Sequence, residues 1–289
     1  MTQTKDDTGL PPISVGVINF NGKKIIERTL NSILESGYPE IDLMVVDDVS
    51  TDDGIEMVRE KFPSVRVFIQ ERNMGPNAAR NRALKEAKHD MVFVTDNDIT
   101  LGPDCLKILV KTMLAEDDIG AVTPMVLDAV EKNRIYANYV GLYYLCFGII
   151  PDRYQNLSPD MDLDPRSSVC GSGGIMLTKK SVAERLGWFD EDLYFGYTDG
   201  EYTFRITASG SKVMQAPKAK IYHLEKAGRE ITRLRYQIRG RWHFILKHYS
   251  ARTLFLLIPA FLFFEAGNLG YLTLKGALGE WFRGVGMVI

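Results

Sequence analysis

The sequence predicts an α/β protein with a mostly parallel central sheet flanked by helices. Short apolar runs rich in Val and Ile, at 13–18, 43–46, 65–69 and 91–94, alternate with stretches in which apolar residues recur at helical spacing. This alternation is typical of a parallel sheet covered by helices on both faces. The length of 289 residues and the 45% hydrophobic content suit one large domain or two modest ones.

Each of the first three runs is followed by a stretch that predicts a helix. Lys23–Ser36 is amphipathic, and Asp53–Phe62 is stopped by Pro63, because the residue before a proline disfavours helical geometry. Gly75–Lys88 carries Pro76 near its first turn, a position that tolerates proline. The first half of the chain therefore predicts strands and helices in strict alternation.

The second half is less regular. We expect an amphipathic helix over Pro103–Glu116 and a strand over Ile119–Leu127. Residues 128–166 predict a loop-rich aromatic insert, with a hairpin as one form, that packs over a sheet edge or forms an acceptor-site wall. A glycine-rich turn that enters a strand is expected at Cys170–Leu177, followed by a helix at Lys179–Leu186 and an aromatic loop at Trp188–Asp192. A helix opened by Asp199 follows at 199–209, and a last short strand lies within Lys212–Tyr222.

Polar side chains follow three of the four early strands. They are Asn19, Asp47 with Asp48, and Asp96 with Asp98. Ligands of such sheets sit at the carboxyl ends of the strands, so these groups are predicted to meet one ligand. Two carboxylates on alternate residues suit a divalent cation beside a phosphate, although a solvated acidic turn has the same pattern.

Two later residues are further candidates. Asp199 opens a helix, where the helix dipole stabilises a carboxylate by about 0.3–1 kcal/mol, as a general base requires; a plain helix cap is the alternative. His223 follows the last strand and is either structural or part of a cation site begun by Asp98. The glycine-rich turn at 170–177 lacks the Gly-Lys-Ser/Thr ending of a P-loop, so we expect it to line the site.

Charge and cysteine content narrow the class of protein. The net charge is −2, which gives no indication of nucleic-acid binding, and three widely spaced cysteines favour a reducing compartment. Residues 1–12 are predicted to be a flexible leader. Residues 1–217 carry a net charge of −10, whereas residues 218–252 carry +8, so an acidic body precedes a basic segment.

The C-terminal segment, residues 226–289, predicts membrane association. Apolar residues at helical spacing between 231 and 249 are interleaved with arginines, and the apolar run Thr253–Phe264 follows. Pro259 and Glu265 make the run shorter than the roughly 20 residues that a spanning helix requires. We expect an in-plane anchor on anionic lipid. The alternatives are a re-entrant or oligomer-forming hairpin and a buried core helix.

Several motifs, taken in order, resemble one enzyme family. They are SVGVINFN at 14–21, VDDVSTDD at 46–53, NMGPNAARNRA at 73–83, TDNDI at 95–99, GSGGIML at 171–177 and GWFDEDLYFGYTDGEYTFR at 187–205. From about Ile13 to about His248 the chain resembles inverting GT-A glycosyltransferases of family 2, in particular rhamnosyltransferase-like members. The resemblance implies a Rossmann-like GT-A catalytic domain over 13–225.

The resemblance implies a nucleotide site. Asp48 resembles the aspartate that binds the nucleotide base, and Arg80 resembles the basic residue near the diphosphate. Asp96 resembles the residue that contacts the ribose, and Asn19 at the end of the first strand is included in the same nucleotide-binding set.

The resemblance also implies a metal site and a base. Asp98 and His223 resemble the ligands of Mg²⁺ or Mn²⁺, and Asp199 resembles the base that deprotonates the acceptor hydroxyl. Family members often have Glu-Asp-x-Asp where this chain has Thr198-Asp199-Gly200-Glu201. Asp199 is therefore the candidate base, with Glu201 in reserve.

The implied function is metal-dependent transfer of a sugar, with inversion, from a UDP- or dTDP-sugar to a glycan or polyprenyl-phosphate-linked acceptor. The implied location is cytoplasmic, peripheral or monotopic on the inner face of the cell membrane, with homo-oligomers through the C-terminal helices as an option. Two alternatives remain: a catalytically inactive glycan-binding or scaffold protein on this fold, and a receiver-like signalling domain, since VVDDVS resembles an acidic phosphoacceptor pocket.

Overall fold

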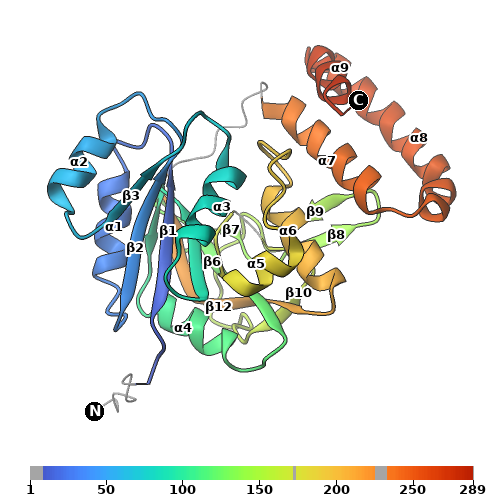
Figure 1. The fold of residues 1–289 in the computed structure, drawn as a ribbon. Helices are drawn as coiled ribbons and strands as arrows, with labels where there is room; N and C mark the ends of the chain where they lie inside the picture. The colour runs from blue at the N-terminus through green and yellow to red at the C-terminus, as the bar shows by residue number, and fades with distance from the viewer. Residues whose placement is uncertain (1–8, 172–173, 225–232, 289) are drawn as a thin grey trace.

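The computed structural model describes residues 9–171, 174–224 and 233–288. A sheet with helices on both faces forms the body, and three C-terminal helices extend from it as an arch (Figure 1). Most of the predicted leader lies outside the described residues, as does the proposed boundary between 225 and 226. The first described strand begins at Ile13, as predicted.

The main sheet has the strand order β10-β12-β6-β11-β4-β1-β2-β3, with β5 paired to β12 and β7 to β6. Strands β1 to β4 are mutually parallel, as is the pair β6 and β12, whereas β11 and β10 run antiparallel to their neighbours. The sheet strands are β1 Ile13–Asn19, β2 Ile41–Asp47, β3 Arg66–Ile69, β4 Met91–Asp96, β5 Ile99–Leu101, β6 Ile119–Asp128, β7 Ile135–Ala137, β10 Arg166–Ser168, β11 Met176–Lys179 and β12 Lys212–His223. The mostly parallel sheet that the sequence predicts is confirmed.

Helices cover both faces of this sheet. One buried cluster joins the sheet to α1, α2 and α4, and a second joins its other face to α3, α5 and α6. These helices are α1 Ile26–Leu34, α2 Gly54–Lys61, α3 Pro76–Glu86, α4 Cys105–Met113, α5 Lys180–Leu186 and α6 Thr198–Ala208. Because both faces are covered, the polar groups at the strand ends open at the edge of the sheet.

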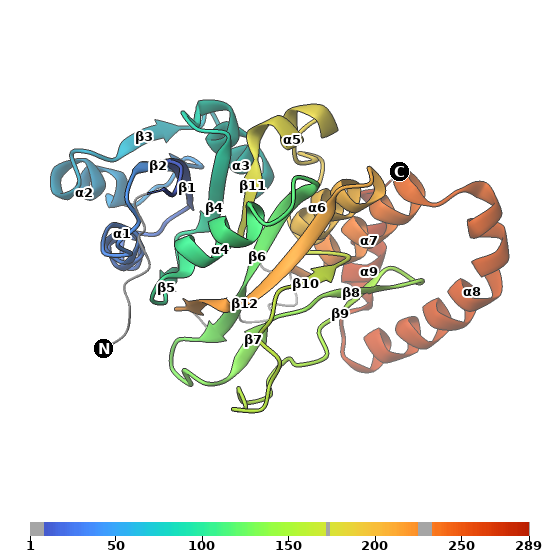
Figure 2. The ribbon, with the colours of Figure 1, turned by 90° about the horizontal axis from the view of Figure 1, so that it is seen from below.

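The second half departs from the prediction in two respects. The last strand, β12, was expected to be short but has twelve residues, because irregularities in its register with β6 let it continue along that strand. The three-residue strands β5 and β10 were not predicted. The aromatic insert does form a hairpin, β8 Gly141–Tyr143 with β9 Phe147–Ile149, beside the arch (Figure 2).

The arch consists of α7 Leu234–His248, α8 Ala251–Leu274 and α9 Leu278–Gly286. The expected basic helix is present from Leu234 onward, whereas Ile231 lies outside the described residues. The apolar run is longer than expected, since α8 continues through Pro259 and Glu265 for 24 residues. By length and composition α8 is the one candidate membrane span in the described part of the chain, and only 6% of its apolar window is buried. It is therefore not a buried core helix.

Candidate active site

Three parallel strands bring their polar ends to one edge of the sheet, here called the rim. Asn19 at the end of β1 is in register with Asp47 at the end of β2, and Ile18 is in register with Asp96 at the end of β4. Parallel pairing places these carboxyl ends side by side, which is the convergence that the sequence predicts.

Asn19 is completely buried within the rim. Its Nδ2 donates to Asp47 Oδ1 at 2.7 Å, and its Oδ1 accepts from Asn97 Nδ2 at 2.6 Å. A Cβ added at Gly22 would lie 2.1 Å from that Asn97 Nδ2, so only glycine permits this close approach. Asn19 thus holds the two acidic loops together, and its amide is engaged by protein groups.

Asp48 fixes the start of α3. It is 3% exposed, and its two carboxylate oxygens accept the backbone N–H groups of Met74 at 2.9 Å and Gly75 at 2.8 Å. Burial raises the pKa of Asp48, while these two hydrogen bonds act in the opposite direction. Asp48 therefore helps to define the helix that carries Arg80.

Arg80 reaches the rim from α3. Its Nη2 donates to Asp96 Oδ1 at 2.9 Å, its Nη1 donates to Asn77 Oδ1 at 3.2 Å, and its buried Nε has no hydrogen-bond partner. Burial raises the pKa of Asp96, Arg80 opposes the rise, and Asp98 adds to it. Arg80 is therefore a buried cation that is paired with Asp96 and has one N–H group without a partner among the described residues.

Asp98 and His223 are brought together by the unpredicted pair of β5 with β12. That pairing sets His223 opposite Ile99, and His223 Nε2 lies 3.3 Å from Asp98 Oδ2. The other oxygen, Asp98 Oδ1, is buried without a hydrogen-bond partner. Burying an oxygen anion without a partner is costly, so this atom fits the position of a cation ligand.

This pair fits a hard divalent cation that takes its remaining ligands from a bound diphosphate. Mg²⁺ is commonly held by one or two carboxylates together with substrate phosphates. Mn²⁺ likewise prefers oxygen ligands to imidazole. Among the described residues, no group of three or more His, Cys, Asp or Glu side chains could hold a metal ion. Asp98 and His223 are thus the two side chains of this place that would hold a cation.

Asp199 lies in the first turn of α6 and faces the rim across Gly174. The Gly174 N–H donates to Asp199 Oδ2 at 3.1 Å. A Cβ added at Gly174 would lie 2.1 Å from Arg80 Nη2 and 3.4 Å from Asp96 Oδ2. With a φ of +68°, Gly174 also has a backbone conformation that favours glycine. One glycine therefore separates the carboxylate of Asp199 from the Arg80–Asp96 pair.

The structure thus gathers the candidate residues at one place. Arg80, Asp96 and Asp199 meet at Gly174, and Asp98 with His223 lies two residues beyond Asp96. The predicted location of the glycine-rich turn agrees with this placement. Asn19 and Asp48 belong to the same rim, but their side chains hold neighbouring loops.

Glu201 is not a second candidate base. It is completely buried, and it accepts hydrogen bonds from Arg205 at 2.9 Å and from His248 at 3.0 Å, with Lys247 Nζ also at 3.0 Å. Burial acts to raise the pKa of Glu201, but His248 and Arg205 overcome it and lower the pKa to about 2. Because this carboxylate joins α6 to α7 in the interior, the reserve role predicted for it is wrong.

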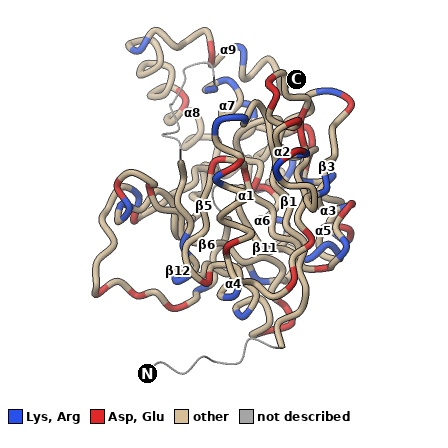
Figure 3. Tube along the Cα trace, turned by 90° about the vertical axis from the view of Figure 1, so that its left-hand side faces the viewer, with Lys and Arg blue, Asp and Glu red and all other residues tan. Residues whose placement is uncertain are grey.

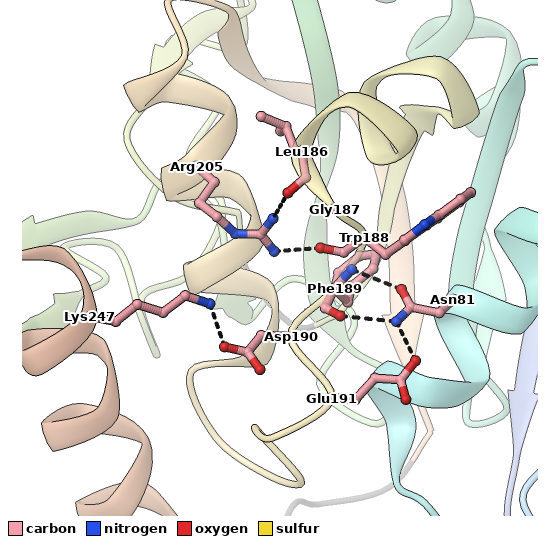
Figure 4. Close-up of a pocket in the computed structure, with 9 residues that line it drawn as sticks. All are labelled: Asn81, Leu186, Gly187, Trp188, Phe189, Asp190, Glu191, Arg205 and Lys247. Atoms are coloured by element: carbon pink, nitrogen blue, oxygen red, sulfur yellow. Dashed lines mark hydrogen bonds and ion pairs between the residues drawn. The ribbon is translucent and has the colours of Figure 1, made fainter.

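A cavity of about 370 Å³ lies beside this junction and not at the rim. Figure 4 shows Arg205 donating to the carbonyls of Leu186 and Trp188, and Lys247 paired with Asp190. Because these polar groups already bind one another, the cavity marks a structural joint between α6 and α7. Substrate chemistry is better placed at the rim.

Sequence reasoning missed two residues that shape the site. Gly174 was covered only by the general expectation for the glycine-rich turn. Tyr197, the residue that precedes α6, has a left-handed φ of 59°, and its hydroxyl donates to the Cys146 carbonyl at 2.5 Å. A left-handed tyrosine leaves no periodic signal in a sequence, so only coordinates could find it.

Comparison with known proteins identifies the family of the chain. The profile of glycosyl transferase family 2 matches residues 14–187. Chondroitin synthase of Escherichia coli is 23% identical over 244 residues, which cover 75% of this chain and 35% of the relative. Poly-beta-1,6-N-acetyl-D-glucosamine synthase of Staphylococcus epidermidis is 25% identical over 178 residues, which cover 60% and 41%. The chain matches less than half the length of these two curated relatives.

Solved structures share the fold. GalNAc-T7 with UDP, GalNAc and Mn²⁺ superposes with a TM-score of 0.66 at 18% identity, covering 82% of this chain and 48% of that one. Mannosyltransferase PcManGT from Pyrobaculum calidifontis with GDP-Man and Mn²⁺ gives 0.63 at 19%, covering 98% and 88%. The family match covers more than half of the chain and the site has the expected residues at one rim: the chain is a GT-A-fold glycosyltransferase that belongs to glycosyl transferase family 2.

Proposed function

We propose that this enzyme transfers a sugar from a nucleoside diphosphate sugar to an acceptor hydroxyl with inversion and with help from Mg²⁺ or Mn²⁺. The observation that carries the proposal is the meeting of Arg80, Asp96 and Asp199 at Gly174. It sets a cationic group, able to balance charge on a leaving diphosphate, close to a carboxylate able to accept a proton.

Each residue has a role in this proposal. Asp199 accepts the proton of the attacking hydroxyl, and no covalent intermediate is needed for a single inverting displacement. Arg80 binds the diphosphate, and Asp96 binds the ribose. Asp98 and His223 hold the cation, whose chemistry is to stabilise negative charge on the leaving phosphate.

We assign the binding of the nucleotide base to Asp48. Both oxygens of Asp48 already accept backbone N–H groups, but a carboxylate has about four acceptor positions, so about two remain, and we assign one of them to an N–H of the base. Asn19 keeps the loops in place from behind, and we assign it an indirect part in nucleotide binding.

Titration calorimetry tests the donor and the metal together. We expect UDP, dTDP or GDP to bind with Mn²⁺ and to bind much more weakly with a chelator. Asp98→Ala removes most of this metal dependence, whereas Asp192→Ala, on an exposed loop, leaves it unchanged. Nucleotide binding that is equally strong with and without metal contradicts the assignment of Asp98 and His223.

A screen of nucleotide-sugar hydrolysis with purified protein and metal identifies the sugar. UDP-, dTDP- and GDP-sugars are all included, because the solved neighbours are complexes with UDP or with GDP-Man. If the chain is instead an inactive glycan-binding protein on this fold, no donor is hydrolysed and no sugar is transferred. The receiver-like alternative is abandoned, because the family match covers residues 14–187.

The acceptor is proposed to be a glycan carried at the membrane, either a growing polysaccharide or a polyprenyl-phosphate-linked glycan. Two relatives are named as polysaccharide synthases. The arch supports the location. The trace of α8 carries few charged positions (Figure 3), because Arg252 and Glu265 are the charged residues of this helix. Exposed side chains on it include Phe255, Leu256, Leu262, Phe263 and Leu274, between 66% and 87% exposed.

The charges of the arch are sorted by sign. Between residues 234 and 288 the acidic side chains are Glu265 and Glu280, which are 14% and 10% exposed and paired with Arg241 and Arg235. Arg252 and Lys275, at the two ends of α8, are exposed. The outward charge is therefore basic, which favours anionic headgroups at about 1 kcal/mol per residue near the surface. The arginines between 231 and 249 were expected to face lipid, but Arg235 and Arg241 are paired with Glu280 and Glu265 of the arch.

We therefore propose that α8 lies in the plane of the bilayer on the cytoplasmic side. Its inner face is occupied by protein, since Glu265 binds Arg241 of α7 and Trp281 of α9. A spanning position would carry these helices, and their charges, into hydrocarbon at high cost.

Flotation with vesicles containing phosphatidylglycerol tests this anchor. The wild type is expected to float, and Phe255→Glu with Phe263→Glu to remain at the bottom. Leu114→Glu is the matched control, because Leu114 is also exposed, at 54%, but lies at the end of α4. If the protein instead forms dimers or larger species without vesicles, the apolar face is assigned to self-association.

A further inference from the structure

The turn of the β8–β9 hairpin is hydrogen-bonded both to the arch and to the residue that precedes α6, the helix that carries Asp199. Three consecutive carbonyls in it accept hydrogen bonds from distant side chains. From α7, Arg241 Nε donates to Leu145 O at 2.9 Å, and at the end of that helix Tyr249 Oη donates to Tyr144 O at 2.8 Å. From the residue before α6, Tyr197 Oη donates to Cys146 O at 2.5 Å. The turn is therefore a joint between these elements.

The hairpin also shares its apolar surface with α8. The ring centroids of Phe147 and Phe264 lie 4.5 Å apart, and the tip of the hairpin points toward the arch (Figure 2). Tyr143, Tyr144 and Ile149 are 41%, 50% and 47% exposed. Tyrosines of this kind favour the interface between lipid and water, since the ring is apolar and the hydroxyl is polar.

Arg241 makes the contact between the hairpin and the arch rigid. It is 5% exposed, with its guanidinium 4.6 Å from the ring centroid of Phe147 and 4.7 Å from that of Phe264. It is also paired with Glu265 of α8. A buried ion pair enclosed by aromatic rings has little freedom to shift, so movement of α8 is transmitted to the hairpin.

Tyr197 connects the hairpin to the proposed base. It is two residues before Asp199, in the left-handed conformation that begins α6. Gly240 of α7 allows its close approach, because a Cβ there would lie 3.1 Å from the Tyr197 ring and 3.0 Å from the Gly196 carbonyl. A left-handed tyrosine persists only where its surroundings hold it, here its hydroxyl bond to Cys146 and this contact.

We propose that the β8–β9 hairpin is part of the bilayer-contacting surface and that its turn positions Asp199 through Tyr197. Lipid contact at α8 and the hairpin then orders the start of α6, so the base is in place when the enzyme is at the membrane. Tyr197 is a positioning residue in this proposal, which rests on the membrane association proposed above.

Hydrogen exchange of the full chain tests the proposal, with vesicles of phosphatidylcholine alone or mixed with phosphatidylglycerol. In the wild type, mixed vesicles are expected to slow exchange at 141–149 and also in the first turn of α6. In Tyr197→Phe the slowing at 141–149 remains and that in α6 is lost. Tyr249→Phe is the matched control: it removes a tyrosine hydroxyl bond to the same turn without touching α6, and it keeps both effects.

Kinetics give a second readout. For Tyr197→Phe we expect kcat for sugar transfer to fall about ten- to a hundredfold, as for a misplaced catalytic group, with the KM for the donor unchanged. Gly240→Ala places a methyl group of α7 against Tyr197. It is expected to have the same effect, although the hydroxyl of Tyr197 is retained.

Three negative results have different meanings. Vesicle binding with slowed exchange in the hairpin but no change in α6 overturns the role of Tyr197 while leaving the membrane association intact. No slowing at 141–149 in floating protein removes the hairpin from the lipid surface. Failure of the wild type to float removes the membrane association, and this inference with it.

Discussion

The rim and the arch differ in the kind of side-chain atoms that lack a protein partner. At the rim, acidic and amide side chains are held by protein partners. Among the described residues, Asp98 Oδ1 and Arg80 Nε are buried there without a hydrogen-bond partner, and both residues act electrostatically on Asp96. On α8, the charged Glu265 is paired inside and the outward face is left apolar.

The difference indicates two kinds of partner. Unpartnered polar atoms inside a firmly built frame suit a charged ligand with fixed geometry, because unmet hydrogen bonds are costly when buried. An unpartnered apolar face suits a partner with no fixed geometry, such as a bilayer. The predictions below test whether each region depends on the features that distinguish it.

The largest expected effect is at the rim. Asp199→Asn should lower the transfer rate by about 10²–10⁴-fold, because a positioned general base contributes that much. Nucleotide affinity, measured by calorimetry, should be unchanged, since Asp199 is assigned to the acceptor hydroxyl. Asp192→Asn, in the preceding exposed loop, is the control. Transfer at the wild-type rate by Asp199→Asn would remove the base from this site.

The next effect concerns the junction of the two regions. Glu201→Gln should lower the free energy of unfolding by about 3–5 kcal/mol, as breaking a buried ion pair commonly does, because Arg205, Lys247 and His248 lose their shared carboxylate. Urea denaturation measures it. The control is Asp53→Asn, which removes an exposed ion pair with Lys23 and should change little. Equal effects would show that the junction is not special.

Two phenylalanines separate the inner from the outer face of α8. Phe261 is 8% exposed and packs beneath the helix, whereas Phe263 is 85% exposed. Phe261→Ala should lower the free energy of unfolding by about 3 kcal/mol, and Phe263→Ala by less than about 0.5 kcal/mol. Vesicle flotation should show the reverse order, with Phe263→Ala weakened more. If both variants lose equal stability, the outer face is covered in solution.

Acid should loosen the junction before the sheet. Burial acts against ionisation of Asp190, but Lys247 and His243 overcome it and lower its pKa to about 2, as happens for Glu201. Because these folded-state pKa values lie below the unfolded ones, the contribution to stability is full above about pH 5 and is lost as pH falls toward 2. The free energy of unfolding measured across this range should fall as the pH is lowered, and it should fall less steeply in Glu201→Gln. A parallel decline in both proteins would assign the acid sensitivity elsewhere.

The sequence was sufficient for features that depend on local pattern. Alternating apolar runs and helical periodicity placed β1 to β4 and α1 to α4, because burial of an element's face is recorded in its own residues. The strand ends of a parallel sheet share one edge, so the meeting of Asn19, Asp47 and Asp96 followed from the fold class. The apolar character of α8 was also evident, although its length was underestimated because Pro259 and Glu265 suggested an interruption.

Only the tertiary structure decided which of these groups have partners. The pairing of β5 with β12 set His223 beside Asp98, 125 residues apart in sequence. The packing of α6 against α7 removed Glu201 from the candidate bases, because it surrounds that carboxylate with Arg205 and His248. Gly174 and Tyr197 act through backbone conformations that leave no periodic trace. Composition and period determined the kinds of element and the chemistry available; contacts between distant segments determined which carboxylate could react and which face could meet lipid, because those depend on packing that no single segment contains.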